Sequence, residues 1–283
     1  MPAPSTLLCL GEIVWDIYPD RRLLGGAPFN LAAHAARLGF DARLISAVGD
    51  DALGREALKN ARDLGVDTSL TRIHGTLPTG VVDVTLDGRA QPTFHLRRPS
   101  AWEEPRVEAV PKADWLVCGT LQQTCPQARA TRLRLLGIPL FYDINLRPGF
   151  EDRDTAEELL SEATVVKCNE AELAWLGEDE ASLLRRHNIS AVCVTLGARG
   201  CRIHANGEAI AVEAPTIEAV DTVGAGDAWS AAALYGFAQQ WPLDHTARFA
   251  NQLGAIVASR AGAIPDWSLD ELEGSGIRLP KSM

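Results

Sequence analysis

The segment from Asp221 to Asp227 combines small residues with a carboxylate where the sequence predicts the start of a helix. It reads DTVGAGD and runs directly into the apolar pattern AWSAAALYGFAQQ. Small residues at a helix start leave backbone N–H groups uncovered, and with the positive end of the helix dipole they can bind an anion. The backbone amides of Gly224, Ala225 and Gly226 are therefore candidates for an anion hole.

Asp227 admits two interpretations. An acidic residue in the first turn of a helix ordinarily stabilises the helix start. A carboxylate beside an anion site is electrostatically unfavourable, however, unless it takes part in the chemistry, and removing a proton from an attacking hydroxyl is such a role. Phosphoryl transfer needs mainly positioning, charge stabilisation and a base, so the segment predicts Asp227 as that base.

A second glycine segment, LGGAPFN, lies between a predicted strand end and the helical pattern LAAHAARLG. Gly25 and Gly26 would let a polyol lie against the backbone. Asp16 and Asn30 would then offer an acceptor and an amide to its hydroxyl groups. Taken alone, the segment is more typical of a glycine turn in which Asn30 caps or packs locally.

In their order and separation, GGAPFNLAAHAARLG and DTVGAGDAW resemble the two signature segments of the ribokinase-like, or PfkB, carbohydrate kinases. NEAE at residues 169–172 fits the N-x-x-E motif of that family, and VTLGARG at 194–200 fits its nucleotide-side strand and turn. The resemblance spans nearly the whole chain. It implies a ribokinase-like three-layer α/β/α fold with a mostly parallel central sheet and a small inserted β lid.

The resemblance also implies a role for each matching position. Asp227 would be the catalytic base, with the amides of residues 224–226 forming the anion hole and Asp16, Gly25, Gly26 and Asn30 contacting the sugar. ATP would lie along Thr195, Gly197 and Gly200, with Asn251 near the adenine. Asn169 and Glu172 would help to hold Mg²⁺ and its waters, and Asp221 and Thr222 would border a monovalent cation such as K⁺. The alternatives are that Glu172 is an ordinary solvated helix residue and Asp221 a structural turn acid.

The sugar is indicated by finer similarities. GEIVWDIYP, the Ala-Pro of GGAPFN and DINLR at 143–147 resemble the fructokinase branch. RRPSA at 97–101 resembles a segment shared by fructokinases and 2-keto-3-deoxygluconate kinases, which implies Arg97 and Asp143 as substrate contacts. An arginine binds a carboxylate or hydroxyl groups equally well, so Arg97 does not decide between an acidic and a neutral sugar. It could also be a solvated charge at a strand end.

We therefore expect transfer of the γ-phosphoryl group of Mg·ATP to a primary hydroxyl of a small sugar, with fructose yielding fructose 6-phosphate. The alternatives are a 2-keto-3-deoxygluconate kinase, a ribokinase and a sugar-binding regulator without catalysis. The intact GAGD segment weighs against the regulator.

The elements that must position these residues follow from hydrophobic periodicity. Short apolar runs alternate with segments of helical period, which predicts βαβ units and a mostly parallel sheet covered on both faces. Residues 71–100 break this rhythm with alternating strands and a turn at Asp87-Gly88. They are either a flap over the site or a peripheral decoration. We expect one kinase domain over residues 1–283, with 71–100 as the inserted lid and a hairpin and two long helices after residue 200.

Length and composition agree with this organisation. The chain has 283 residues, of which 46% are hydrophobic and 23% charged, as in ordinary globular proteins. No apolar stretch is long enough to span a membrane, and the first residues lack the features of a signal peptide, so a cytoplasmic protein without a membrane partner is expected. The net charge of −10 excludes nonspecific nucleic-acid binding.

Two further expectations concern thiols and assembly. The six cysteines show no metal-binding spacing, and four of them lie in apolar runs, which predicts buried reduced thiols. A lid sheet with a free edge invites pairing with a second copy, so a homodimer through the lid is expected.

Overall fold

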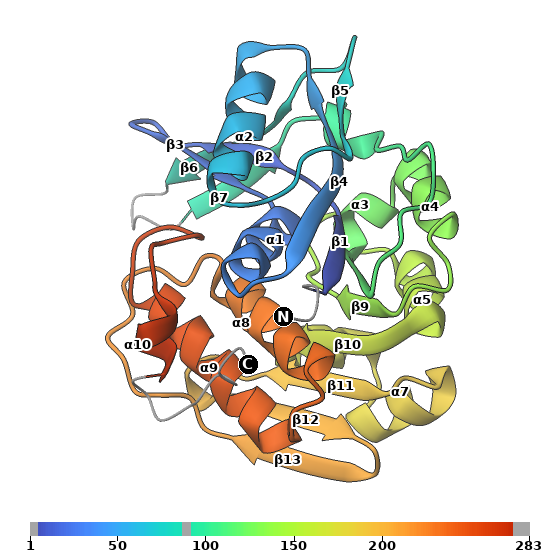
Figure 1. Ribbon diagram of the computed structural model, residues 1–283, viewed down its shortest axis with the longest axis vertical. Helices are drawn as coiled ribbons and strands as arrows, with labels where there is room; N and C mark the ends of the chain where they lie inside the picture. Colours follow the sequence, from blue (N-terminus) through green and yellow to red (C-terminus); the bar gives the residue numbers. More distant parts are fainter. Residues whose placement is uncertain (1–4, 87–91, 274–283) are drawn as a thin grey trace.

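The computed structural model describes residues 5–86 and 92–273, which fold around a nine-stranded sheet (Figure 1). In spatial order its strands are β13 (Glu208–Val212), β12 (Cys201–Ala205), β11 (Ala191–Thr195), β10 (Ala163–Asn169), β9 (Leu140–Asp143), β8 (Trp115–Gly119), β1 (Thr6–Leu10), β4 (Asp41–Gly49) and β5 (Thr71–His74). Neighbouring strands from β11 to β5 are parallel, and β12 and β13 extend the sheet as the predicted antiparallel hairpin.

Helices cover both faces of this sheet, which explains why its strands are continuously apolar. In β1, Leu7 and Cys9 face one core cluster, while Leu8 and Leu10 face another. The first cluster includes residues of α1 (Ala27–Arg37), α2 (Ala52–Asp63), α8 (Ala225–Ala238), α9 (Leu243–Ala258) and α10 (Leu269–Glu273). The second includes residues of α5 (Arg153–Glu162), α6 (Glu170–Leu176) and α7 (Glu180–His187). The predicted three-layer α/β/α architecture is confirmed.

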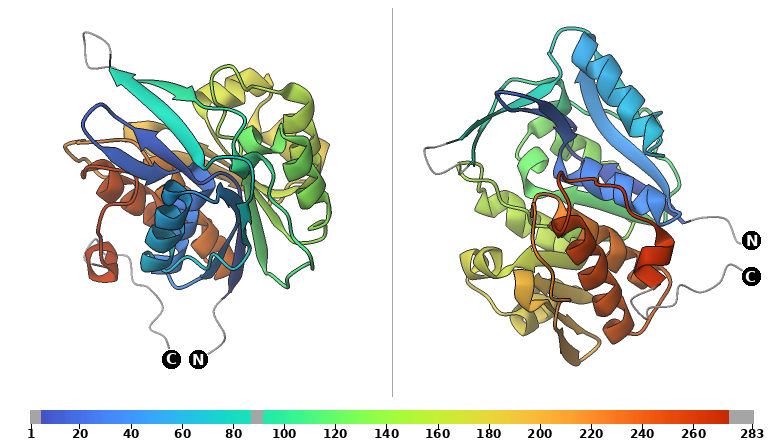
Figure 2. Two further views of the ribbon diagram at one scale, coloured as in Figure 1. Left: turned by 90° about the horizontal axis from the view of Figure 1, so that it is seen from above. Right: turned by 90° about the vertical axis from the view of Figure 1, so that its left-hand side faces the viewer.

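A second sheet of four strands forms the lid, in the order β3 (Arg22–Gly25), β2 (Val14–Ile17), β6 (Gly80–Leu86) and β7 (Pro92–Leu96). Figure 2 shows it standing to one side of the helix-covered body. Its inner residues Val14 and Val82 pack with residues of α3 (Thr120–Gln123), α4 (Pro126–Leu133) and the short 3-10 helix η1 (Ala101–Glu103).

The predicted lid boundary of 71–100 is wrong in two respects. Residues 71–74 form β5, which pairs in parallel with β4 at the edge of the large sheet. Two of the four lid strands come instead from residues 14–25, and β2 pairs in parallel with β6. The alternating pattern that marks a hairpin in sequence shows only antiparallel neighbours, so it does not reveal the strand from another part of the chain. The turn predicted at Asp87-Gly88 lies outside the described residues.

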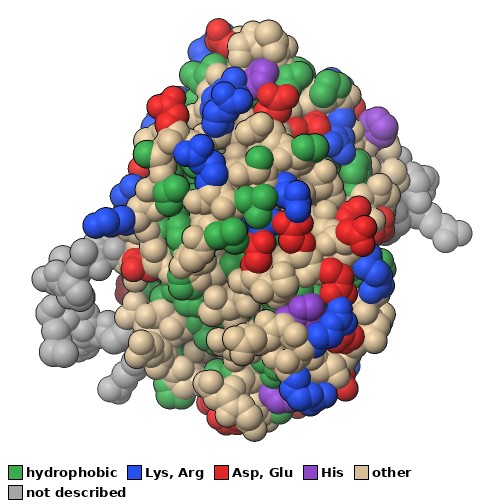
Figure 3. All heavy atoms as spheres, turned by 90° about the vertical axis from the view of Figure 1, so that its right-hand side faces the viewer, with side chains coloured by type: hydrophobic (Ala, Val, Ile, Leu, Met, Phe, Trp, Pro, Cys, Tyr) green, Lys and Arg blue, Asp and Glu red, His purple; other side chains and the backbone are tan. Residues whose placement is uncertain are grey.

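The surface and the thiols agree with the composition. On the face drawn in Figure 3, Lys and Arg side chains are interspersed with Asp and Glu. All six cysteines are free and buried, as predicted. Among the helices of residues 5–86 and 92–273, none has the length and apolar character needed to cross a bilayer.

The parallel strands of the large sheet bring several polar residues together at one edge. Because the carboxyl ends of parallel strands meet at one edge of the sheet, residues that follow them lie close together. At this edge β9 ends at Asp143, β10 at Asn169 and β11 at Thr195, and two of these residues belong to the predicted metal and nucleotide sites.

Candidate active site

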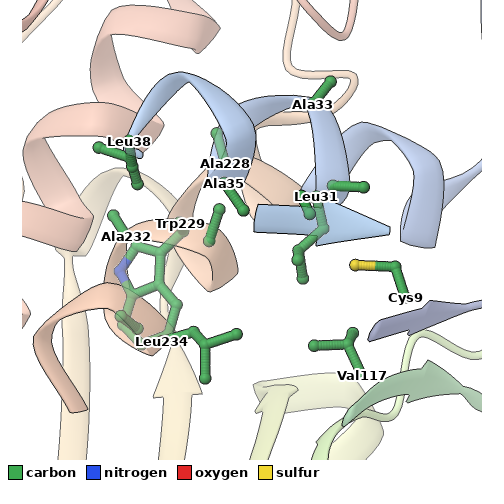
Figure 4. Packing of buried hydrophobic residues seen from close by; sticks show 14 of the residues in the cluster. Cys9, Leu31, Ala33, Ala35, Leu38, Val117, Ala228, Trp229, Ala232 and Leu234 are labelled. Atoms are coloured by element: carbon green, nitrogen blue, oxygen red, sulfur yellow. The ribbon is translucent and has the colours of Figure 1, made fainter. Parts of the chain in front are cut away.

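The two glycine segments meet where α1 and α8 pack together. Figure 4 shows Ala35 of α1 and Leu38 just after it beside Ala228 and Ala232 of α8 in one buried cluster. Alanines at this contact let the two helices approach closely. Their first turns therefore lie side by side, although they are almost two hundred residues apart in the chain.

Asn30 and Asp227 are joined directly across this helix pair. Asn30 Nδ2 donates a hydrogen bond to Asp227 Oδ2 at 2.8 Å. Asp227 Oδ1 has no hydrogen-bond donor among the described residues, so one carboxylate oxygen is available to a ligand. Asn30 Oδ1 is buried and unpartnered as well, and a buried acceptor of this kind needs a donor such as a hydroxyl group. The alternative that Asn30 only caps or packs locally is wrong.

The start of α8 has the uncovered amides that an anion hole requires. Gly224 adopts a left-handed conformation with φ of 78° at the helix N-cap. Ala225 N donates to Thr222 O over 3.3 Å, whereas the N–H groups of Gly224 and Gly226 have no acceptor within the part of the chain that the structure describes. These N–H groups and the helix dipole can bind an anion beside Asp227.

The glycines before α1 are required by close packing. A Cβ on Gly26, whose φ is 114°, would lie 2.3 Å from Glu12 O. A Cβ on Gly25 would lie 3.1 Å from Asp16 Oδ2. Glu12 itself is buried and accepts a hydrogen bond from Ala27 N at 3.3 Å, at the start of α1. These glycines therefore bring Asp16 and Glu12 close to the helix start that carries Asn30.

Asp143 is engaged inside the protein. Its side chain is 5% exposed and binds Lys167 Nζ with both oxygens, at 3.1 and 3.2 Å. Ser230 Oγ of α8 donates to Asp143 Oδ2 at 2.9 Å. The structure thus places Asp143 beneath the site as an ion-pair partner rather than as a free sugar acceptor.

Lys167 was missed by the sequence reasoning. It stands in the run TVVKC, which reads as an ordinary buried strand. A lysine inside such a run needs a buried acidic partner, and this signal could have identified it.

Arg97 lies on the lid surface, whereas Arg147, to which no role was assigned, acts on the site carboxylates. Arg97 forms a bidentate ion pair with Asp83 on the exposed surface of the lid, with both distances 2.6 Å. Arg147 is exposed, has no ion pair within the described ranges, and acts electrostatically on Glu12, Asp16 and Asp227. The arginine whose charge reaches the predicted sugar contacts is therefore Arg147.

Burial and nearby positive charges have opposite effects on the pKa values of Asp227 and Asp16. Burial raises the pKa of Asp227 to about 7, and Asp143 raises it as well, whereas the hydrogen bond from Asn30 and the charges of Lys167 and Arg147 lower it. Burial also raises the pKa of Asp16 to about 6 against the effect of Arg147. A carboxylate with a pKa near neutrality is suited to general base catalysis.

The N-x-x-E motif forms the N-terminal cap of α6. Asn169 Oδ1 accepts from Glu172 N at 2.9 Å, and Glu172 Oε2 accepts from Asn169 N at 2.8 Å. Glu172 Oε1 accepts from Leu146 N at 2.9 Å, and the residue is only 7% exposed. Burial raises the pKa of Glu172, while Lys167 lowers it. The alternative of an ordinary solvated residue is wrong for Glu172.

These oxygens fit the way in which proteins hold Mg²⁺. Within residues 5–86 and 92–273, no three His, Cys, Asp or Glu side chains are grouped to hold a metal. Magnesium, however, usually binds to one or two protein oxygens, several waters and the phosphates of a nucleotide. Asn169 and Glu172 at the carboxyl end of β10 suit this mode.

Asp221 joins the loop before α8 to the loop after α9. Its Oδ1 accepts from Val223 N and its Oδ2 from Gly262 N, both at 3.0 Å. Thr222 is exposed beside it. The structural role proposed as the alternative is thus present, and both carboxylate oxygens keep lone pairs that could face a cation.

The predicted nucleotide residues differ in how open they are. Thr195 is partly buried at the end of β11, and Gly197 is exposed at the start of the 3-10 helix η2 (Gly197–Arg199). Gly200 is buried, and a Cβ there would lie 2.0 Å from Val212 O. Asn251 is 4% exposed and its amide is taken up by Trp229 Nε1, Val212 O and Glu213 O. The Asn251 side chain is therefore engaged inside the protein rather than presented to a nucleotide.

Comparison with known proteins identifies the family. The model of the pfkB family of carbohydrate kinases matches residues 20–269. The chain belongs to the pfkB family. Relatives in this family include fructokinase-1 of Oryza sativa subsp. japonica, 34% identical over 85% of this chain and 84% of the rice protein. The fructokinase of Klebsiella pneumoniae is 33% identical over 90% of this chain and 94% of its own.

Solved structures of the family share the fold over nearly the whole chain. The fructokinase of Vibrio cholerae O395, solved with fructose, ADP and a calcium ion, has a TM-score of 0.85 and 27% identity over 96% of this chain and 99% of that chain. The fructokinase of Xylella fastidiosa with bound ATP has a TM-score of 0.85 and 26% identity over 95% of this chain and 97% of that chain. The fold that carries Asp227 is thus that of the pfkB-family kinases.

Proposed function

We propose that the protein transfers the γ-phosphoryl group of ATP to a primary hydroxyl of a small neutral sugar, with the 6-hydroxyl of fructose as the first candidate. The observation that carries the proposal is the hydrogen bond between Asn30 and Asp227 beside the uncovered amides of α8. A base, a hydroxyl acceptor and an anion site would thus lie together where the first turns of α1 and α8 meet.

The chain's own residues account for the reaction. The free oxygen of Asp227 takes the proton of the sugar hydroxyl while the hydroxyl oxygen of the sugar attacks the γ-phosphorus of ATP. The bond to the bridging oxygen breaks, and ADP leaves with that bond's electron pair. The amides of Gly224 and Gly226 stabilise negative charge on the transferring group. Asn30 Oδ1 and Asp16 accept hydrogen bonds from other hydroxyls of the sugar and orient it.

The metal and nucleotide sites complete this assignment. Asn169 and Glu172 would hold Mg²⁺ through its waters, and the ion would neutralise charge on the phosphates. Thr195 and Gly197 would lie along the nucleotide. Asp221, Thr222 and backbone groups near Gly262 would border a monovalent cation.

The charges around the site favour a neutral sugar. The site has more acidic than basic side chains. The four carboxylates are those of Glu12, Asp16, Asp143 and Asp227, and the two cations are Lys167 and Arg147. Lys167 is already paired with Asp143, and Arg97 with Asp83. A sugar acid would add a further negative charge to this surplus.

A second candidate, a 2-keto-3-deoxygluconate kinase, is favoured by one observation. Arg147 has no ion-pair partner among the described residues and could bind a substrate carboxylate. The family relatives named fructokinase and the charge surplus place this candidate second.

A substrate panel tests the proposal. Fructose, ribose and 2-keto-3-deoxygluconate are each supplied with Mg·ATP, and ADP release is measured. Fructose should give the highest kcat/KM, and Asp227→Asn should lower kcat by about 10³-fold or more, because the base is lost while the shape of the site remains. Sugar binding without ADP release in the wild type would support the non-catalytic regulator instead. Near-normal turnover by Asp227→Asn would remove Asp227 from the mechanism.

We also propose a homodimer that forms through the lid. Strand β7 is an edge of the lid sheet, and its Phe94 is 52% exposed. A free edge with an exposed aromatic side chain supports pairing with a second copy.

A further inference from the structure

Lys167 is a cation buried within a strand of the central sheet. It is 7% exposed and lies in β10 between Val166 and Cys168, which are fully buried. Removing an ammonium group from water is unfavourable unless it is paired. The ion pair with Asp143 compensates the charge, but an apolar residue in place of each partner would have avoided the need for it.

The location of the Lys167 ammonium group suggests its purpose. A Cβ built on Gly226 would lie 3.3 Å from Lys167 Nζ, so the ammonium group lies directly behind the first turn of α8. One turn further along the same helix, Ser230 Oγ is bonded to Asp143. Asp227 lies between these two residues. The ion pair thus touches α8 on both sides of the proposed base.

The polar and charged groups around Asp227 come from several elements. The charges of Asp143 in β9, Lys167 in β10 and Arg147 in the loop after β9 act on Asp227, and Asn30 of α1 donates a hydrogen bond to it. Next to these groups, Glu172 acts on Lys167, and both Glu12 and Asp16 interact with Arg147. Asp143 favours the protonated form of Asp227, whereas Lys167 favours the ionised form. Without Lys167, two neighbouring carboxylates would lack a shared cation, and one of them would take up a proton.

We propose that Lys167 is a positioning residue for the base: held by Asp143 behind Gly226, its ammonium group fixes the first turn of α8 and favours the ionised form of the Asp227 carboxylate. The inference rests on the proposed role of Asp227 and adds the device that sustains it.

The test compares Lys167→Met, Lys167→Arg and Asp143→Asn with the wild type. For each protein, kcat/KM for fructose is measured against pH at saturating Mg·ATP. In parallel, the titration of Asp227 is followed by carbon NMR of protein labelled at the aspartate carboxyl groups, with Asp227→Asn used for assignment. The titration of ATP itself is common to all four proteins, so the differences between them report on the enzyme.

The expected shifts have opposite signs. Lys167→Met should move the acid limb of the pH profile of kcat/KM and the titration of Asp227 to higher pH by roughly one unit. The reason is the loss of the cation that favours the ionised form of Asp227. Asp143→Asn should move both to lower pH, since the repelling carboxylate is lost and Lys167 remains. Lys167→Arg should leave both near the wild-type position. A residue with a purely structural role would lower kcat/KM without producing these opposite displacements.

Each remaining outcome is decisive. If Lys167→Met titrates and reacts at the wild-type pH, the proposal is wrong. If Lys167→Met does not fold, as judged by circular dichroism, Asp143→Asn decides the question, and an unmoved titration there overturns the proposal. The NMR titration does not need a substrate. Failure of the kinase assignment, seen as no sugar phosphorylation or an active Asp227→Asn, is therefore separate from failure of the role of Lys167.

Discussion

At the residue scale, the reactivity of Asp227 depends on opposing effects of its surroundings. A base acts in its ionised form, and burial raises the pKa of this carboxyl to about 7. We therefore expect kcat/KM for the sugar to fall as the pH decreases through about 7. Asn30→Ala removes a hydrogen bond that lowers this pKa, so the decline should then begin at higher pH. The measurement is kcat/KM for the sugar against pH with the enzyme saturated by Mg·ATP, so that the pH dependence of nucleotide binding does not contribute. A value of kcat/KM independent of pH in this range would contradict the role of Asp227.

Gly224 is expected to be essential for the shape of the anion hole. Its φ is 78°, and a Cβ would lie 2.5 Å from Ala263 O. Gly224→Ala should therefore lower the free energy of unfolding by about 1–3 kcal/mol and reduce kcat, as measured by denaturant melts and turnover. Gly75→Ala is the matched control, because its Cβ meets no atom within 4 Å. Equal stability of the two variants would show that the left-handed turn is not under strain.

The sequence predicted the residues that carry recognisable motifs better than those that act through them. Asp227 and Asn30 were both identified, and the structure joins them. Lys167 and Arg147 were not assigned a role, because their partners come from other elements and have no fixed spacing in the chain. Asn251 and Arg97 were assigned ligand contacts, although the structure engages them with Trp229 and Asp83.

At the scale of secondary structure, the cap of α6 is also the proposed Mg²⁺ site. Glu172→Gln should weaken the apparent Mg²⁺ affinity by about tenfold, because an amide holds the ion's waters less well than a carboxylate. The measurement is turnover as a function of free Mg²⁺. Asp179→Ala provides a control for the loss of a helix cap, since Asp179 accepts from Ser182 N at the start of α7 as Asn169 accepts from Glu172 N at the start of α6. The control should lose about 1 kcal/mol of stability with an unchanged Mg²⁺ requirement, and an equal change in both variants would refute a metal role for Glu172.

Local patterns predicted the elements well and their partners less well. The helices at 225–238 and 243–258 and the hairpin at 201–212 follow from period and turn residues, and the structure contains each. The assignment of β5 to the lid failed, because a four-residue strand has the same alternation in either sheet. Its partner β4 lies more than twenty residues earlier, and only the packed structure shows which edge it joins.

At the scale of the whole molecule, the proposed dimer depends on the exposed edge of the lid. Phe94→Asp should shift the protein from dimer to monomer in light scattering, because a charge on the edge strand opposes its burial. Val110 is equally exposed at 52% but lies outside the lid, so Val110→Asp should leave the mass unchanged. A wild-type monomer at working concentration would contradict the dimer.

The lid is built from two separate segments of the chain, since α1, β4, α2 and β5 of the body lie in sequence between strands β2 and β3 and strands β6 and β7. A chimaera that takes only residues 71–100 from a homologue would replace two of the four lid strands, β6 and β7. It would also replace β5, an edge strand of the large sheet. A graft meant to change sugar preference would have to take residues 14–25 and 80–96 together, and would carry Asp16 along with them.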